Sequence, residues 1–196
     1  YRLRAYDIDG ITGYSNTITV VTAPASPVAS AATFVTEVGL SANWAASPGA
    51  VKYYLDVATS SGFTAGTFVA GFENKDVGNV LTYSVTGLTA NSTYYYRVRS
   101  GGSSGGTSTS SNTITALTAP LPPVSLAATP ITQTSITAEW NASAGATKYY
   151  LDVSTSNTFA SFVAGYNALD VGNVTQYLVS PLTSGATYYY RVRSNN

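Results

Sequence analysis

The stretch Leu88-Thr-Ala-Asn-Ser-Thr-Tyr94-Tyr-Tyr96-Arg-Val98 returns almost unchanged as Leu182-Thr-Ser-Gly-Ala-Thr-Tyr188-Tyr-Tyr190-Arg-Val192. In the first copy Tyr94, Tyr96 and Val98 alternate with Tyr95 and Arg97, and the second copy has the same order. This period-two pattern is typical of a half-buried β-strand. A third, shorter copy opens the chain as Tyr1-Arg-Leu-Arg4. The stretch therefore predicts one type of strand at three places along the chain.

The repetition extends outward from this stretch. Lys52-Tyr-Tyr-Leu-Asp-Val57 recurs as Lys148-Tyr-Tyr-Leu-Asp-Val153, and Asp76-Val-Gly-Asn79 recurs as Asp170-Val-Gly-Asn173. The period is about 95 residues, which is the size of a whole domain and too long for one unit of a solenoid.

Other runs in each repeat also alternate with period two. They include Leu40-Ser-Ala-Asn-Trp44, Val51 to Val57 and Tyr83-Ser-Val85, and clusters of Gly, Pro, Asn and Ser separate them. No segment shows a convincing helical period. Many short strands at regular spacing predict an all-β sandwich.

Trp44 in an early strand, together with the stretch from Leu88 to Val98, closely resembles the fibronectin type III pattern, and Trp140 does the same in the second copy. The resemblance implies that both tryptophans lie in strand B. It also implies that Tyr94 and Tyr188 are tyrosine-corner residues, which return their hydroxyl groups to nearby backbone. The details are most similar to repeats in large surface proteins of Bacteroidota-type bacteria. One departure is Ala90, with Ser184 in the second copy, where the family usually has proline.

The resemblance implies tandem immunoglobulin-like (fibronectin type III) β-sandwiches, and it also implies how the chain is divided among the repeats. Residues 1–22 are expected to be strands F and G of a preceding repeat, with strand F at residues 1–6 and strand G at 16–21. Residues 23–118 are expected to form a complete domain, and residues 119–196 a domain that lacks its last strand. Proline-rich joints at residues 22–27 and 118–123 favour extended, semi-rigid connections.

The amino-acid composition argues against several classes of function. Charged residues make up 9% of the chain and the formal net charge is zero, so the sequence has no basic patch and we expect no binding of DNA or RNA. The chain has no histidine and no cysteine, which removes the commonest general base and every thiolate. No apolar run approaches the roughly 18 residues of a membrane helix. We expect no enzyme activity, cofactor, bound metal or membrane insertion in this segment.

Two short motifs have alternative interpretations. Asp7-Ile-Asp9-Gly10 is similar to the start of a calcium loop, but no distal glutamate follows, and a hairpin turn explains it better. Asp76-Val-Gly-Asn79 and its second copy are turn residues by type. Weak contact with a metal ion or a glycan is the alternative for them.

The outward residues of strands C and F form the candidate interaction face, because these strands are antiparallel neighbours in the family. An acidic residue facing arginines that lie on tyrosine rings would form a stabilising cross-strand ladder. The alternative is a recognition face for sugars or a partner protein, since Tyr and Arg are common in interface hot spots. The face comprises Tyr54, Asp56, Tyr95, Arg97 and Arg99 in one repeat and Tyr150, Asp152, Tyr189, Arg191 and Arg193 in the other.

The sequence favours a non-catalytic structural array, a stalk, spacer or fibre of an extracellular or cell-surface protein. Copies could join head to tail if residues 16–21 of one chain completed the last sandwich of another. The alternative is a binding module: an adhesin, a module for other surface proteins or glycans, or accessory repeats of a secreted polysaccharide-degrading enzyme.

Overall fold

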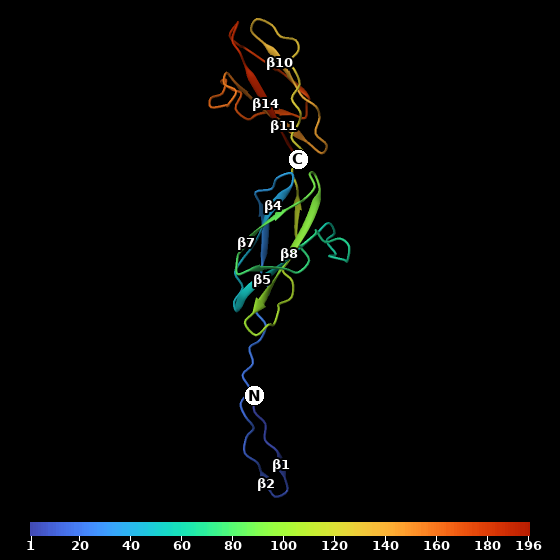
Figure 1. Ribbon diagram of the computed structural model, residues 1–196, viewed down its shortest axis with the longest axis vertical. Coiled ribbons are helices and arrows are strands. Elements are labelled where there is room, and N and C mark those ends of the chain that lie inside the picture. Colours follow the sequence, from blue (N-terminus) through green and yellow to red (C-terminus); the bar gives the residue numbers. More distant parts are fainter. The chain divides into compact units, whose positions relative to one another are not determined.

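The computed structural model describes residues 1–196, and its regular elements are all β-strands (Figure 1). They form a hairpin near the N-terminus, a middle sandwich from β3 to β9 and a C-terminal sandwich from β10 to β14. The predicted all-β class is therefore confirmed. No helix of a length and hydropathy suited to crossing a bilayer occurs.

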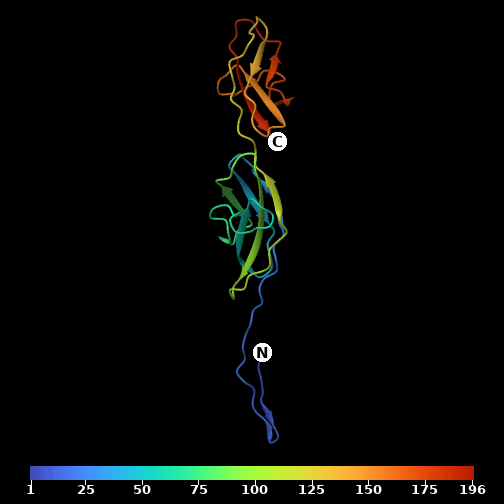
Figure 2. The ribbon, with the colours of Figure 1, turned by 90° about the vertical axis from the view of Figure 1, so that its right-hand side faces the viewer.

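The middle sandwich has two sheets, with strand orders β3-β4-β7 and β6-β5-β8-β9. The chain crosses between the two sheets three times, from β4 to β5, from β6 to β7 and from β7 to β8. Figure 2 shows this sandwich turned by 90°. Its strands are β3 (Ala29–Thr33), β4 (Gly39–Trp44), β5 (Ala50–Ala58), β6 (Lys75–Gly78), β7 (Thr82–Thr86), β8 (Thr93–Gly102) and β9 (Ile114–Leu117).

The core of the middle sandwich follows the predicted alternation. On β8, Tyr94, Tyr96 and Val98 are buried, while the residues between them are partly exposed. The rings of Trp44 and Tyr53 lie 5.8 Å apart between their centroids. Each large apolar side chain buried in this way contributes about 1.5–3 kcal/mol.

The C-terminal sandwich repeats this plan with sheets β10-β13 and β12-β11-β14. Its core contains Trp140, Tyr149, Leu151 and Val153, and the Trp140 and Tyr149 ring centroids are again 5.8 Å apart. The strands are β10 (Ile136–Glu139), β11 (Lys148–Ser154), β12 (Leu169–Gly172), β13 (Gln176–Val179) and β14 (Tyr189–Asn195).

Both predicted tyrosine corners are present. The Tyr94 hydroxyl accepts a hydrogen bond from the Thr89 N–H at 2.9 Å, and the Tyr188 hydroxyl accepts one from the Thr183 N–H at 2.9 Å. Each corner fixes the loop that precedes its strand, because the phenol reaches back five residues to the backbone.

The N-terminal hairpin has only short regular strands, β1 (Tyr6–Asp7) and β2 (Gly10–Ile11). Asp7 Oδ1 accepts hydrogen bonds from the N–H groups of Asp9 and Gly10, so this motif is an aspartate-stabilised turn.

Beyond the turn the two arms pair through side chains as well as backbone. Ser15 N–H donates to the Leu3 carbonyl at 2.8 Å, and Leu3 N–H donates to Ser15 Oγ at 3.0 Å. A side-chain oxygen thus replaces a ladder carbonyl. Of the predicted strand at 1–6 only Tyr6 lies in a regular strand, and the predicted strand at 16–21 is wrong, because no regular strand forms there.

The Asp-Val-Gly-Asn motif forms a β-bulge in each sandwich. Tyr53 pairs with Gly78 while Tyr54 pairs with Asp76, so Val77 is the extra residue. Asp76 Oδ1 accepts the Gly78 N–H at 2.9 Å, and Gly78 has a φ of 71°, which favours glycine. The second copy has the same register shift. The motif therefore has a local folding role.

Candidate functional site

The predicted ladder between strands C and F lies on β5 and β8. In the sheet register Asp56 is opposite Arg97 and Tyr54 is opposite Arg99. The second sandwich pairs Asp152 with Arg191 and Tyr150 with Arg193 across β11 and β14. Tyr95 lies opposite Ala58, and Tyr189 lies opposite Ser154. The sequence thus identified the cross-strand neighbours on both sheets.

The structure corrects the expectation that Asp56 belongs to an exposed face. Residues 59–74 fold back along β5, with hydrogen bonds from Val57 N–H to the Phe72 carbonyl and from Val69 N–H to the Val57 carbonyl. This loop covers the Asp56 side chain, which is only 3% exposed. Asp56 therefore cannot meet a ligand from solution.

Three donors surround the buried Asp56 carboxylate. The Asn74 N–H lies 2.6 Å from Oδ1, Arg97 Nε lies 2.9 Å from Oδ2, and Arg99 Nη2 lies 3.4 Å from both oxygens. A buried carboxylate without partners would cost several kcal/mol. These donors offset that cost and attach the loop to the sheet.

The same correction applies to Asp152, which is 1% exposed. Its carboxylate accepts hydrogen bonds from the Ala168 N–H at 2.6 Å and from Arg191 Nε at 2.8 Å, and Arg193 Nη2 lies 3.6 Å away. Asn74 and Ala168, which supply the backbone donors, both have positive φ values, 52° and 54°. A left-handed residue at this point turns the N–H toward the carboxylate.

One arginine of the face in each sandwich lies over a phenylalanine ring of the loop that follows strand C. The Arg97 guanidinium lies 4.1 Å from the Phe63 ring centroid, and Arg191 lies 4.3 Å from that of Phe159. Such pairs contribute about 0.5–2 kcal/mol each. Neither phenylalanine was singled out from the sequence. The signal that could have found them is that each follows a repeated strand C by a few residues.

A second cation–aromatic pair lies at the edge of each sheet. Lys52 Nζ lies 4.9 Å from the Tyr54 ring centroid and 2.8 Å from Asp76 Oδ2. The hydrogen bond from Lys52, with that from the Gly78 N–H, holds the pKa of Asp76 below its usual value. In return, the hydrogen bonds with Asp76 and then Tyr54 raise the pKa of Lys52.

The C-terminal copy has the same contacts, but the order of the causes that shift the pKa values differs. Lys148 Nζ lies 3.0 Å from Asp170 and 4.9 Å from the Tyr150 ring. The Gly172 N–H is the main cause that lowers the pKa of Asp170, and Lys148 comes second. The pKa of Lys148 is raised by Tyr150 first and by Asp170 second.

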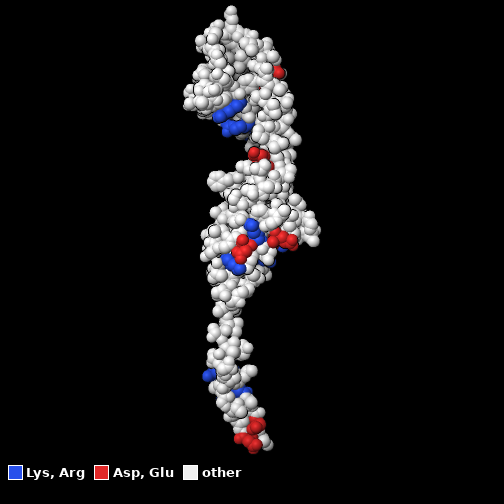
Figure 3. All heavy atoms as spheres, in the orientation of Figure 1, with Lys and Arg blue, Asp and Glu red and all other residues white.

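Charged groups are few and mostly paired. Figure 3 shows a mainly white surface on which blue and red atoms lie together over the middle sandwich. No group of three or more acidic side chains could hold a metal ion. The face is therefore a set of ion pairs and cation–aromatic contacts within each sandwich.

Comparison with known proteins agrees with this geometry. Residues 121–196 match the model of the fibronectin type III domain family. Exoglucanase B of Cellulomonas fimi is 31% identical over 219 residues, and the alignment covers 100% of this chain and 18% of that protein. The chain thus spans less than a fifth of this relative. The predicted similarity to Bacteroidota-type repeats gains no support from these matches.

A solved structure gives the same fold. The crystal structure of chicken CNTN1 FN1-FN3 domains covers 100% of this chain and 69% of its own, with a TM-score of 0.54 and 16% identity. At this identity the match concerns the fold alone. With the family match and the two tyrosine corners, it shows that the chain folds as tandem fibronectin type III β-sandwich domains, as predicted.

Proposed function

We propose that this chain is a run of non-catalytic fibronectin type III repeats that acts as a spacer in a secreted polysaccharide-degrading enzyme. The observation that carries the proposal is the similarity to Exoglucanase B, which runs along 100% of this chain. Residues 1–22, 23–118 and 119–196 then belong to three successive repeats. We also propose an extracellular location, which the same similarity supports.

The contacts of the candidate face support a spacer over a sugar-binding platform. A sugar stacks on the face of an exposed aromatic ring, and Lys52 and Lys148 already lie over the rings of Tyr54 and Tyr150. Arg97 covers Phe63 in the same way. These cations hold the loops and sheet edges in place, which suits a module whose task is to keep its shape.

The decisive experiment uses the whole protein that carries this chain and a variant with residues 1–196 deleted in frame. A spacer predicts unchanged turnover of a soluble oligosaccharide and a several-fold slower attack on insoluble polysaccharide. A parent gene without a catalytic domain for glycosidic bonds would overturn the enzyme part of the proposal. The spacer part would be wrong if deletion lowered both activities equally.

A binding experiment tests the alternative. The chain is mixed with insoluble cellulose, xylan and chitin, and the protein left in solution is measured. We expect it to remain in solution. Retention that disappears in the Tyr54→Ala, Tyr150→Ala double variant would instead identify the face as a glycan-binding site.

A further inference from the structure

β7 lies at the end of its sheet in the middle sandwich, with β4 on one side and no strand on the other. The N–H of Trp44 donates to the Leu81 carbonyl at 3.0 Å, so the backbone of Leu81 points toward β4. In an antiparallel pair the backbone groups of successive residues point to opposite sides. Those of Thr82, Ser84 and Thr86 therefore point away from β4. We call this side of β7 the open edge.

The other edges of the middle sandwich have features that discourage further pairing. On β3, the Asn112 side chain binds both the N–H and the carbonyl of Ala29, at 2.9 Å and 3.0 Å. β6 contains a bulge and carries Lys75 and Asp76, and β9 is short and leads to Pro120. Charges, bulges and short strands are common ways to protect an edge. β7 has no charged residue and no proline, so its edge lacks such protection.

The C-terminal sandwich closes the corresponding edge with one side chain. β13 lies beside β10 as β7 lies beside β4, and Ser180 corresponds to Thr86 in the repeat. The Tyr166 hydroxyl accepts a hydrogen bond from the Ser180 N–H at 2.9 Å and donates one to the Ser180 carbonyl at 2.9 Å. Pro181 follows and has no N–H to offer. This edge is therefore occupied within its own sandwich.

The middle sandwich lacks the hydroxyl that would close its edge. Phe72 stands at the place of Tyr166, after the same Val-Ala-Gly, and both rings are buried. Phe72 packs against Tyr83 with ring centroids 6.3 Å apart. Its ring has no polar group that could bind the backbone of Thr86. The N–H and carbonyl of Thr86 consequently remain free at the open edge.

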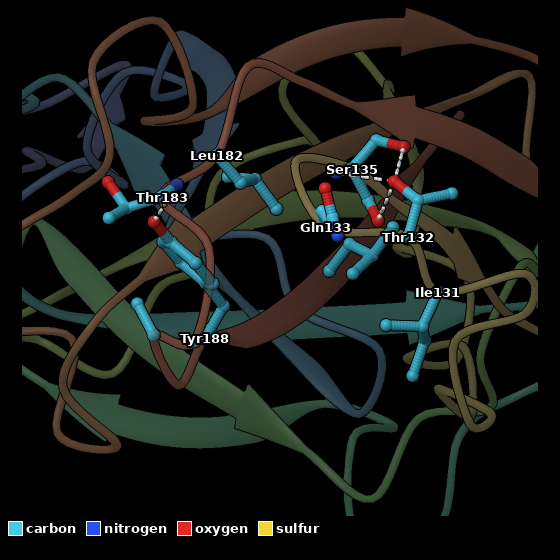
Figure 4. A pocket seen from close by; sticks show the side chains of 10 residues that line it. Ile131, Thr132, Gln133, Ser135, Leu182, Thr183 and Tyr188 are labelled. Atoms are coloured by element: carbon cyan, nitrogen blue, oxygen red, sulfur yellow. Dashed lines mark hydrogen bonds between the residues drawn. The ribbon is translucent and has the colours of Figure 1, made fainter.

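A hollow of about 270 Å³ in the C-terminal sandwich lies beside its tyrosine corner (Figure 4). Leu182, Thr183 and Tyr188 line one side of it, and Thr132 and Ser135 line the other. No residue of β13 contributes to its wall. The hollow is therefore separate from the backbone groups that the tyrosine hydroxyl occupies, and it leaves that edge closed.

The sequence of β7 is complementary to itself. In an antiparallel pair of two copies centred on Ser84, Thr82 faces Thr86 of the other copy. Tyr83 faces Val85 in the same way. Pairs of threonines, and pairs of an aromatic with a β-branched residue, are favourable across antiparallel strands. The residues whose backbone points outward also face one another in this register, so each free N–H meets a carbonyl.

We propose that two copies of this chain pair through their open edges, β7 against β7, in an antiparallel register centred on Ser84. The sheet β3-β4-β7 then continues into the same sheet of the other copy. Because the same surface meets itself, the contact has twofold symmetry and closes at a dimer. This inference goes beyond the spacer role and is independent of it, because it concerns a contact between two chains.

Light scattering of the 196-residue chain over a range of concentrations tests the pairing. We expect the mass to rise from that of a monomer to that of a dimer and no further. Phe72→Tyr supplies the hydroxyl that can bind Thr86, as Tyr166 binds Ser180, and it should weaken the dimer about tenfold or more without lowering Tm. A chain that stays monomeric at hundreds of micromolar, or a variant that pairs as tightly, would overturn the proposal.

Ser84→Lys is an independent test, because this side chain is exposed and the register brings the two charges to the same point. Like charges directly opposite each other are destabilising, so the dimer should weaken about tenfold or more at low salt. Leu178→Lys is the matched control, because Leu178 corresponds to Ser84 on the closed edge and is also exposed. It should leave the dimer unchanged. Equal weakening by both variants, or a mass beyond that of a dimer, would contradict pairing through β7.

Single cysteines test the register, since the chain has no cysteine of its own. Residues that exchange both hydrogen bonds across antiparallel strands have Cα atoms about 5.5 Å apart, which is within reach of a disulfide. Ser84→Cys should therefore cross-link two copies under mild oxidation. Thr82→Cys is the matched control: it is also exposed, but it lies opposite Thr86 of the other copy, and it should cross-link far more slowly. Equal rates for the two variants would show that the register is wrong.

Discussion

The two sandwiches contain the same aspartate–arginine ladder, yet they differ in how far the arginines are exposed. The carboxylates are equally buried, with Asp56 3% and Asp152 1% exposed. Arg97 is 29% exposed, whereas Arg191 is 52% exposed. The difference in exposure is larger for the next arginine along each strand, since Arg99 is 28% exposed and Arg193 is 59% exposed.

Two differences accompany this exposure: β8 pairs with β9 as well as with β5, whereas β14 pairs with β11 alone, and one loop residue differs between the copies. Asn74 Oδ1 accepts a hydrogen bond from Arg99 Nη2 at 2.9 Å, whereas Ala168 at the same place has no side-chain acceptor. The carboxylate depends on sheet register and one backbone N–H, which both copies have. The comparison teaches that the buried half of the ladder is fixed by the repeated strands, while its outer half varies with the neighbouring strand and with a loop residue, and both differ between the copies.

Removal of the carboxylate should have the largest effect. Asp56→Ala leaves Arg97 and the Asn74 N–H without their buried acceptor, and we expect a loss of about 3 kcal/mol. Asp152→Ala should cost less, about 2 kcal/mol, because the more exposed Arg191 can be hydrated. Urea unfolding measures both, with Trp140→Phe making Trp44 the reporter of the middle sandwich and Trp44→Phe the reverse. Equal losses would contradict the role of arginine exposure.

The tyrosine corners give a second contrast. Tyr94→Phe leaves the Thr89 N–H unpaired beside a 5%-exposed ring, and it should cost about 1–2 kcal/mol. Tyr188→Phe should cost less, because the hollow beside Tyr188 lets water reach the Thr183 N–H. The same single-tryptophan unfolding experiments measure the difference, and a larger cost at Tyr188 would contradict it.

Asn74 and Ala168 occupy the same place in the two loops, and exchanging these residue types should reduce the difference in how the outer arginine is held in the two sandwiches. Ala168→Asn places a residue that tolerates positive φ at this position and offers Arg193 an acceptor, so we expect a gain of about 0.5–1 kcal/mol. Asn74→Ala should lose a similar amount. Ala168→Gly is the matched control, because it relieves the backbone but supplies no acceptor. If Gly and Asn stabilise equally, the side-chain acceptor contributes nothing.

The smallest effect concerns pH. The pKa values of Asp76 and Asp170 are lower in the folded chain than in the unfolded chain, so their contribution is full above about pH 4 and is lost as pH falls through the folded pKa. Lys52 is the main cause for Asp76, whereas the Gly172 N–H is the main cause for Asp170. Lys52→Ala should therefore flatten the acid dependence of Tm more than Lys148→Ala does, at low salt. The reverse order would contradict this assignment.

Much of this organisation could be predicted from the sequence, and the failures have a physical cause. Alternation of polar and apolar residues identified the strands and the neighbours of Asp56, because sheet register follows from period two. Burial of Asp56 could not be predicted, since it depends on how residues 59–74 fold. That loop has no periodic pattern, and its last left-handed residue is Asn74 in one copy but Ala168 in the other. The contact between Arg97 and Phe63 could not be predicted for the same reason.

The segment that closes the middle sandwich, Ser111-Asn-Thr-Ile-Thr115, is identical in sequence to Ser15-Asn-Thr-Ile-Thr19, and this identity has a consequence for biosynthesis. Neighbouring repeats with interchangeable strands can pair wrongly before each has folded, which is a known failure of repeat proteins. A ribosome needs roughly 5–20 s for a repeat of about 95 residues, while small β-domains fold in milliseconds to seconds. Each repeat can therefore fold around its own strand before the next repeat emerges. Timing of synthesis, rather than sequence differences, then keeps the repeats separate.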